Sequence, residues 1–189
     1  MFNAELGQAT FREVTWFMGN TASGGEGGGA LCNAGKVTFA SRTYFTGNVA
    51  EEAGGRSGGD GGAVHTAAGG VTTFRRKANF RNNRSGSTGG AVHSGGITIL
   101  EGSGVFSGNM AWGPETGHGG HVYASGVFEI AGDATFRSGK ASQHGGALFV
   151  SGTGDASFNG KLEFIDNEAS RQCHDVYDAS SSVVCLSVQ

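Results

Sequence analysis

Apolar and polar residues repeat along this chain with a period of about 28 residues. Each repeat carries two large apolar positions six residues apart, and the second of them opens the pattern Phe-x-x-Asn. The first positions are Phe11, Phe39, Phe74, Leu100, Ile130 and Phe158, with a further match at Leu186. Short runs of β-branched and aromatic residues alternate with glycine-rich corners, and no segment has the 3.6-residue period of a helix. The pattern therefore predicts short strands throughout.

A second motif, Gly-Gly-x-aliphatic, marks the start of each repeat. It begins at Gly28, Gly61, Gly89, Gly119 and Gly145, and in a degenerate form at Cys173. Three extended stretches follow one another in a typical repeat, as in "GAVH", "GITIL" and "GVFSG". Three strands and three corners per turn predict an all-β fold, a right-handed parallel β-helix. We expect one domain over residues 1–189 with six coils and a partial seventh, "VVCLSV".

Two columns should run along the inside and one corner of this solenoid. The aromatic residues of Phe-x-x-Asn predict an inward stack of Phe17, Phe45, Phe80, Phe106, Phe136 and Phe164. The asparagines predict a ladder of Asn20, Asn48, Asn83, Asn109 and Asn167, in which stacked amides hydrogen-bond along the axis. Gly139 takes the place of asparagine in the remaining coil. Because Gly and Asn both tolerate the left-handed conformation, we expect a corner with positive φ here.

Composition and charge narrow the class of protein. The chain has 37 glycines but one proline and no three-residue period, which excludes collagen. Thirteen phenylalanines are too many for a chain that buries nothing. The net charge of −3 argues against a nucleic-acid partner. No apolar run is long enough for a transmembrane segment, and the first residues do not have the pattern of a secretory signal.

The pairing of Gly-Gly-Ala-aliphatic with Phe-x-x-Asn, once per coil from Phe11 to Leu186, resembles the repeats of chlamydial polymorphic outer-membrane proteins. It is also similar to glycine-rich β-helical proteins of algae and other microbial eukaryotes, within the broad pectate-lyase-like class. The resemblance implies a secreted or surface-displayed scaffold, often adhesive. The chain lacks the terminal caps and membrane barrel of the bacterial group, and the charged constellation of the lyases.

A candidate binding stripe follows from the alternation of side chains along a strand. The residue after each inward aliphatic should point outward. That column reads Cys32, His65, His93, Tyr123, Phe149 and Tyr177, and its rings offer a surface for a sugar or a protein partner. The alternatives are an aromatic ladder that only stacks on itself, or a face turned inward by one step of register.

Two longer connections add further candidates. Insertions at about 49–60 and 110–118 should project from the same corner two coils apart, and Trp112 in the second is a candidate contact residue. Both could equally be tolerated insertions. A basic run, "FRRKANFRNNR", places Arg75, Arg76, Lys77, Arg81 and Arg84 near one corner, as a solvated edge or as a patch for an anionic partner.

The histidine and cysteine residues are candidates for metal and disulfide chemistry. His65 with His93, and His118 with His144, form two adjacent pairs that we interpret as polar ladders, so we expect no metal site and no cofactor. Cys173 and Cys185 bracket the closing segment 173–189, and in an oxidising compartment a disulfide would pin the last rung.

These observations favour a non-catalytic scaffold located outside the cell, at its surface or in an organelle lumen. We expect contacts with a protein assembly at an end coil or loop edge, or with a polysaccharide. The competing hypothesis is a small or degenerate polysaccharide lyase, in which Asp175, His174 and Tyr177, or the His65/His93 pair, would converge with an arginine in one groove.

Overall fold

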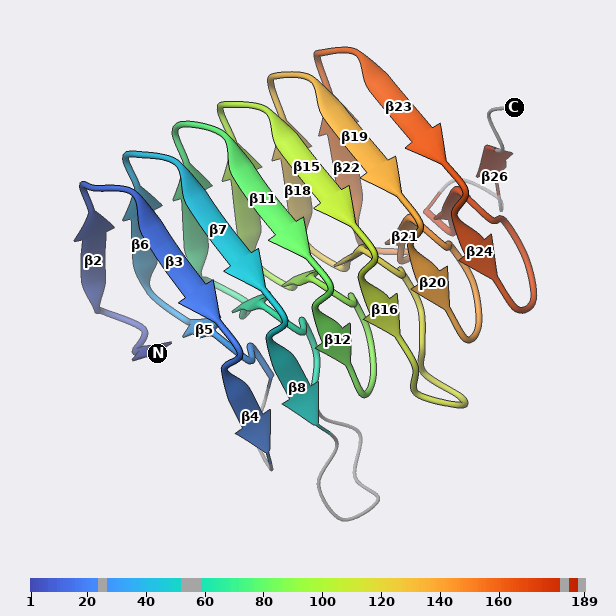
Figure 1. Ribbon diagram of the computed structural model, residues 1–189, viewed down its shortest axis with the longest axis horizontal. Helices are drawn as coiled ribbons and strands as arrows, with labels where there is room; N and C mark the ends of the chain where they lie inside the picture. The colour runs from blue at the N-terminus through green and yellow to red at the C-terminus, as the bar shows by residue number, and fades with distance from the viewer. Residues whose placement is uncertain (24–26, 52–58, 181–183, 187–189) are drawn as a thin grey trace.

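The computed structural model describes residues 1–23, 27–51, 59–180 and the backbone of 184–186. These residues form 26 short strands and no helix. The strands belong to four sheets, in which each strand pairs with its equivalent one coil earlier and one coil later. The fold is therefore a parallel β-solenoid of about six turns, as the repeat predicts (Figure 1).

The four sheets are named A to D in the order in which each coil visits them. Sheet A holds β1 (Phe2–Asn3), β5 (Leu31–Asn33), β9 (Val64–Thr66), β13 (Val92–Ser94), β17 (Val122–Ala124), β21 (Leu148–Val150), β25 (Val176–Asp178) and β26 (Val184–Leu186). Sheet B holds β2 (Gln8–Phe11), β6 (Lys36–Phe39), β10 (Val71–Phe74), β14 (Ile97–Leu100), β18 (Val127–Ile130) and β22 (Asp155–Phe158). Sheet C holds β3 (Thr15–Met18), β7 (Thr43–Thr46), β11 (Ala78–Arg81), β15 (Gly104–Ser107), β19 (Ala134–Arg137) and β23 (Leu162–Ile165). Sheet D holds β4 (Thr21–Ser23), β8 (Val49–Glu51), β12 (Arg84–Ser85), β16 (Met110–Ala111), β20 (Lys140–Ala141) and β24 (Glu168–Ala169).

The solenoid is right-handed. In Figure 1 the chain rises along β2 at the back, crosses at the top, descends along β3 and β4 at the front, and advances from left to right with each coil. Viewed along the direction of advance, this is a clockwise path. Right-handed crossovers are the strong preference of parallel strands, because the twist of the strand favours that return path.

Each coil has four strands, so the prediction of three strands and three corners was wrong. The strand that the sequence did not reveal is the one in sheet D, which follows the asparagine column. It is two or three residues long and turns a single small side chain inward, as Ala50, Ser85 and Ala111 do. A strand of that length has no alternation that a sequence pattern could detect.

The prediction that "VVCLSV" continues the spiral as a partial seventh coil was also wrong. The seventh strand of sheet A is β25, and β26 pairs antiparallel with it, with Val176 opposite Leu186 and Asp178 opposite Val184. The chain therefore turns back after β25 instead of continuing the spiral. β26 covers the edge of sheet A at this end.

The core consists of phenylalanine columns in fixed register. Phe45 lies opposite Phe80 on the neighbouring strand, and ring centroids along the column from Phe17 to Phe164 are 4.8–5.2 Å apart. A second column begins with Phe11, Phe39 and Phe74 on sheet B and meets the first edge to face. Such offset and edge-to-face contacts are the favourable geometries of aromatic rings.

The asparagine ladder is continuous but does not occupy the predicted backbone conformation. The Oδ1 atom of Asn48 accepts from Asn20, that of Asn83 accepts from Asn48, and that of Asn109 accepts from Asn83, at 2.8–3.0 Å from the donating side chains. Positive φ belongs instead to the residue before each asparagine, for example Gly47, Asn82 and Gly108. The expectation of positive φ at the asparagines was therefore wrong by one position.

The two positions of the repeat motif require glycine for different reasons. The first, as at Gly61 and Gly89, has φ of 63°, which a side chain disfavours. The second has rungs packed against it: a Cβ atom on Gly62 would lie 2.2 Å from the carbonyl oxygen of Gly90. In the motif before β25, Cys173 takes the first position, with φ of 57°.

Candidate functional site

The outer face of sheet C carries a groove of about 760 Å³. Side chains at the second and fourth position of each strand point outward, because the first and third hold the core. Both outward rows line the groove, and its lining residues come from all six strands. At one strand spacing per coil the groove extends over roughly 24 Å along the axis. Sheet C faces the viewer in Figure 1.

An aromatic pair stands at one end of this groove. The rings of Trp16 and Tyr44 are stacked, with centroids 3.9 Å apart and planes 8° from parallel. Their strands β3 and β7 are neighbours, with Trp16 directly opposite Tyr44. Trp16 is 59% exposed, which is unusual for the largest apolar side chain. The pair offers a flat apolar surface to a ligand that reaches along the groove.

The next side chain in the same row carries an unsatisfied donor. Asn79 lies opposite Tyr44 on β11, and its Nδ2 atom is buried without a hydrogen-bond partner among the described residues. Buried amides are nearly always satisfied by protein or water. Further along the row, the Thr135 hydroxyl donates to Glu163 at 3.3 Å. The row thus passes from aromatic to amide to hydroxyl and carboxylate.

Two arginines stand in the second outward row. Arg81 pairs with Ser107, and Ser107 pairs with Arg137, so the two arginines are two rungs apart and about 10 Å from each other along the axis. Both are exposed and line the groove. The basic run of the sequence is therefore distributed over the surface: Arg75 to Lys77 form the corner between sheets B and C, Arg81 lies in the groove, and Arg84 lies on sheet D. The expectation of a cluster at one corner was wrong in this respect.

The predicted stripe forms a single column of stacked rings on sheet A. His65 pairs with His93, His93 with Tyr123, and the column continues to Phe149 and Tyr177. Neighbouring ring centroids are 4.8–5.2 Å apart. The column is not the open surface that the sequence suggested, because His65 and Phe149 are each 9% exposed.

Neighbouring turns cover this column. His118 packs on Phe149, and His144 packs on Tyr177, with ring centroids 4.5 and 4.8 Å apart. The two histidine pairs of the sequence therefore join one aromatic cluster. Burial, and then the nearby His144 and Arg171, lower the pKa of His118 to about 4. At neutral pH this ring is uncharged.

A hydrogen-bonded series joins the other end of the column to the loop before Gly61. The Thr88 hydroxyl donates to Asp60 at 2.6 Å, and it therefore accepts from Nδ1 of His93 at 2.7 Å. Burial lowers the pKa of His93 to about 4, against the opposing charge of Asp60. The His93 side chain is 13% exposed. The series holds a neutral ring in place beneath the surface.

The residues of the lyase hypothesis do not share one surface. Asp175 is buried inside the coil, where Oδ1 accepts from Asn167, whereas Tyr177 belongs to the outward column. His174 accepts from the backbone amide of Ala169. Across the described ranges no group of three or more His, Cys, Asp and Glu side chains is arranged for a metal ion.

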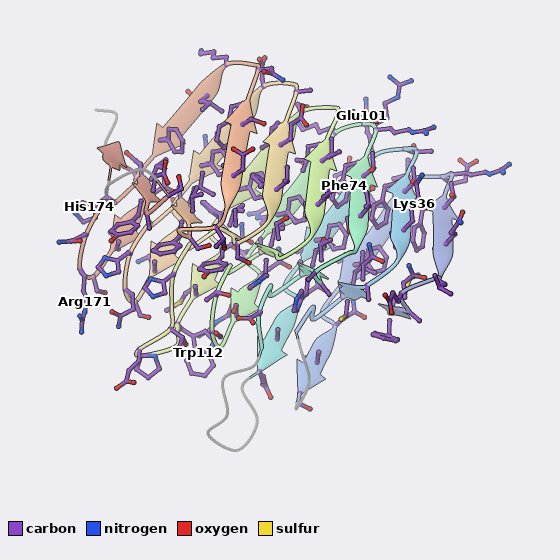
Figure 2. All side chains as sticks on the ribbon, turned by 180° about the vertical axis from the view of Figure 1, so that it is seen from behind. Lys36, Phe74, Glu101, Trp112, Arg171 and His174 are labelled. Atoms are coloured by element: carbon purple, nitrogen blue, oxygen red, sulfur yellow. The ribbon has the colours of Figure 1, made fainter. Side chains whose placement is uncertain are left out.

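Trp112 lies away from the groove. It follows β16 on sheet D, is 39% exposed, and is seen at the lower edge of the molecule in Figure 2. Side chains of Ser142 and Gln143 from the next coil donate to the carbonyl groups of Gly113 and Pro114. The turn after Trp112 is thus attached to its neighbour. Most of the other insertion, residues 52–58, lies outside the described residues.

The ends of the solenoid differ. Exposed large apolar side chains concentrate on the first coil: Met1, Phe2, Leu6, Val14, Trp16 and Met18. At the other end Cys173 is disulfide-bonded, while the side chain of Cys185 lies outside the described residues. The Cys173–Cys185 pairing and the contact at an end coil stay predictions. No helix that could cross a bilayer occurs in the described part of the chain.

Comparisons with protein-family models, with curated proteins and with solved structures give no match. The fold is therefore established from the strand pairing of this chain itself.

The groove on sheet C was not predicted from the sequence. Its signal was present one residue before each core phenylalanine, where Trp16, Tyr44 and Asn79 stand. Because side chains alternate between the two faces of a strand, these residues next to an inward phenylalanine should point outward.

Proposed function

We propose that the protein is a non-catalytic binding scaffold whose sheet C groove holds an extended polysaccharide. The observation that carries the proposal is the stacked pair of Trp16 and Tyr44 beside the unsatisfied Nδ2 atom of Asn79. The face of a sugar ring presents C–H groups that pack on an aromatic ring, while its hydroxyl groups bond to amides. The groove supplies an aromatic surface and an amide donor on neighbouring strands.

The shape of the groove supports a linear ligand. It is open, crosses six parallel strands, and is lined by outward side chains at equivalent positions of successive strands. A chain of similar units laid along the axis meets equivalent positions at successive rungs. A protein partner would need a ridge of comparable length and narrowness. We therefore favour the polysaccharide over the protein partner for this face.

The location follows from the proposal and from the resemblance of the repeats. Scaffolds resembling the repeats of chlamydial polymorphic outer-membrane proteins are secreted or displayed at a surface. We propose the same setting here, outside the cell or in an organelle lumen. The stability that six stacked phenylalanine rings contribute suits a rigid scaffold of this kind.

The test is a binding screen against soluble glycans of several backbone types, followed by calorimetry on those that bind. Trp16→Ala and Tyr44→Ala should each weaken binding by about tenfold or more, because they remove the aromatic surface. Trp112→Ala is the matched control and should leave the affinity unchanged. Circular dichroism verifies that each variant retains its fold. Absence of binding to every glycan class, or equal losses in the Trp16 and Trp112 variants, would contradict the proposal.

A further inference from the structure

We infer that the ligand of the sheet C groove is an acidic glycan, carrying carboxylate or sulfate groups. This inference rests on the proposed function and adds the charge of the ligand. It starts from the distribution of charged side chains around the groove, which the overall net charge of −3 conceals.

One long margin of the groove is basic over the first three coils. The turns between sheets B and C contain residues 12–14, 40–42 and 75–77 in these coils. They bring together five cations and one carboxylate, that of Glu13. The cations are Arg12, Arg42, Arg75, Arg76 and Lys77. A hollow of about 630 Å³ lies at this corner and is lined by Arg42, Arg76 and Lys77, together with Ser41 and Ser103.

The opposite margin carries Arg81 and Arg137 at the ends of their strands. The groove is therefore bordered by positive charge on both sides at the third coil, whereas the corner between sheets B and C carries Glu101 in the fourth coil and Asp133 in the fifth. Its one lining carboxylate is Glu163, on the last strand.

None of these cations is neutralised by a carboxylate. Among the described residues, Lys140 with Glu168 is the one ion pair that involves a lysine or an arginine. Exposed cations on a protein of negative net charge usually alternate with acidic partners, so a one-sign cluster of this size indicates an anionic partner. Guanidinium groups suit this role because their planar donors match carboxylate and sulfate oxygens in pairs.

The two-sided arrangement fits the geometry of a linear acidic glycan. In an extended 1,4-linked chain, acidic groups of alternate sugars point to opposite sides. One set would meet Arg81 and Arg137, which are separated by about 10 Å, a spacing of two rungs. The other set would meet Arg42, Arg76 and Lys77. The rings between them would pass over Tyr44 and Asn79.

The test compares a neutral β-glucan oligosaccharide, a polyuronate oligosaccharide and a sulfated oligosaccharide of equal length by calorimetry at low salt. We expect the acidic ligands to bind more tightly by about tenfold or more. Binding of these ligands should weaken strongly when salt is raised toward 1 M, where the Debye length falls to about 3 Å. Whether the polyuronate or the sulfated oligosaccharide binds more tightly identifies the class of acidic glycan.

Two double variants locate the contact. Arg81→Gln with Arg137→Gln, and Arg42→Gln with Lys77→Gln, should each reduce acidic-glycan affinity by about tenfold or more. The control variant, Lys36→Gln with Arg84→Gln, removes the same charge from sheets B and D. It should change the affinity for the acidic glycan by less than about twofold. Lys36 is labelled in Figure 2. All substituted side chains are exposed, and each variant is verified by its thermal midpoint.

The outcomes separate the two proposals. Equal affinity for the neutral and acidic ligands, lost in Trp16→Ala, would overturn the inference that the ligand is acidic. The groove would then still be a glycan site. Failure of all three ligands, and of the wider screen, would overturn the proposed function itself. Binding of DNA or acidic lipid vesicles in preference to every glycan, abolished by the same arginine variants, would also overturn the inference.

Discussion

The imidazole of His121 fills the space that an asparagine side chain occupies in the other coils, directly against Gly139. Its Nδ1 atom accepts from Asn109 at 2.9 Å, and Nε2–H therefore donates to Oδ1 of Asn167 at 3.2 Å. A Cβ atom on Gly139 would lie 2.6 Å from the ring and 2.3 Å from the carbonyl oxygen of Gly146. The ladder is thus carried across the coil that lacks asparagine by a residue from a different strand position.

This relationship predicts a compensating pair of substitutions. Four other repeats have alanine where His121 stands, as at Ala63 and Ala91, and the other coils have asparagine where Gly139 stands. His121→Ala alone opens a cavity and leaves amides unpaired, and Gly139→Asn alone drives a side chain into the ring. Each should cost about 2–4 kcal/mol of unfolding free energy. The double variant removes the ring that the new asparagine side chain would strike, so its loss should be smaller than the sum by about 2 kcal/mol.

Urea unfolding of the four proteins measures this cycle. The matched control combines His121→Ala with Gly102→Ala, a glycine at a distant corner, for which the losses should be additive. Additive losses for His121 and Gly139 as well would mean that the two residues do not share one site.

Acidification should destabilise the fold through the buried histidines. Burial lowers the pKa of His121 to about 3 and that of His93 to about 4, from an ordinary value near 6.5. Below pH 6.5 these histidines therefore bind protons in the unfolded chain but stay neutral in the folded chain. The free energy of unfolding should decrease as the pH falls from 6.5 toward 4. Two such groups give a slope of up to about 3 kcal/mol per pH unit near pH 5.

Unfolding midpoints in urea at half-unit steps between pH 7 and 4.5 test this sign. His93→Gln should flatten the dependence by about one proton, since glutamine does not titrate. Stability that rises on acidification in this window would show that these rings are charged in the folded state.

The closing segment should be held by the Cys173–Cys185 disulfide. The antiparallel pairing of β25 with β26 returns the chain toward Cys173, with Cys185 opposite Tyr177. Alkylation followed by mass spectrometry should find these two cysteines protected until a reductant is added. Reduction should cost about 3 kcal/mol, the value for a closed loop of this length, and Cys173→Ser should match it. Cys32→Ser, which leaves this bridge intact, serves as the control.

Sequence patterns predicted the fold well because each coil repeats the same local requirements. The interval of six residues between Phe39 and Phe45, or Phe74 and Phe80, already fixes two inward columns. The fourth strand was not predictable, since Ser85 or Ala111 alone shows no alternation. Nor was the reversal at β26, because Leu186 matches the core pattern equally well in a seventh coil and in an antiparallel strand.

Site residues were predicted less well because exposure depends on what the loops cover. The alternation that placed His93 outward was right, but nothing in the sequence showed that Asp60 and Thr88 would close over it. The substitution of His121 for an asparagine is equally invisible, since the partners are 12 and 46 residues away in sequence. The same alternation of side chains along a strand would have predicted that Trp16 and Tyr44 point outward.

Tryptophan fluorescence can detect a glycan that lies on the Trp16–Tyr44 end of the sheet C groove. The chain has two tryptophans, so Trp112→Phe leaves Trp16 as the single reporter. Titration of this variant with the tightest-binding oligosaccharide should give a saturable blue shift, because the ligand removes water from an indole that is 59% exposed. Its midpoint should match the calorimetric one, and Trp16→Phe should show no shift. Calorimetric binding without any change in Trp16 emission would place the ligand elsewhere and contradict the account.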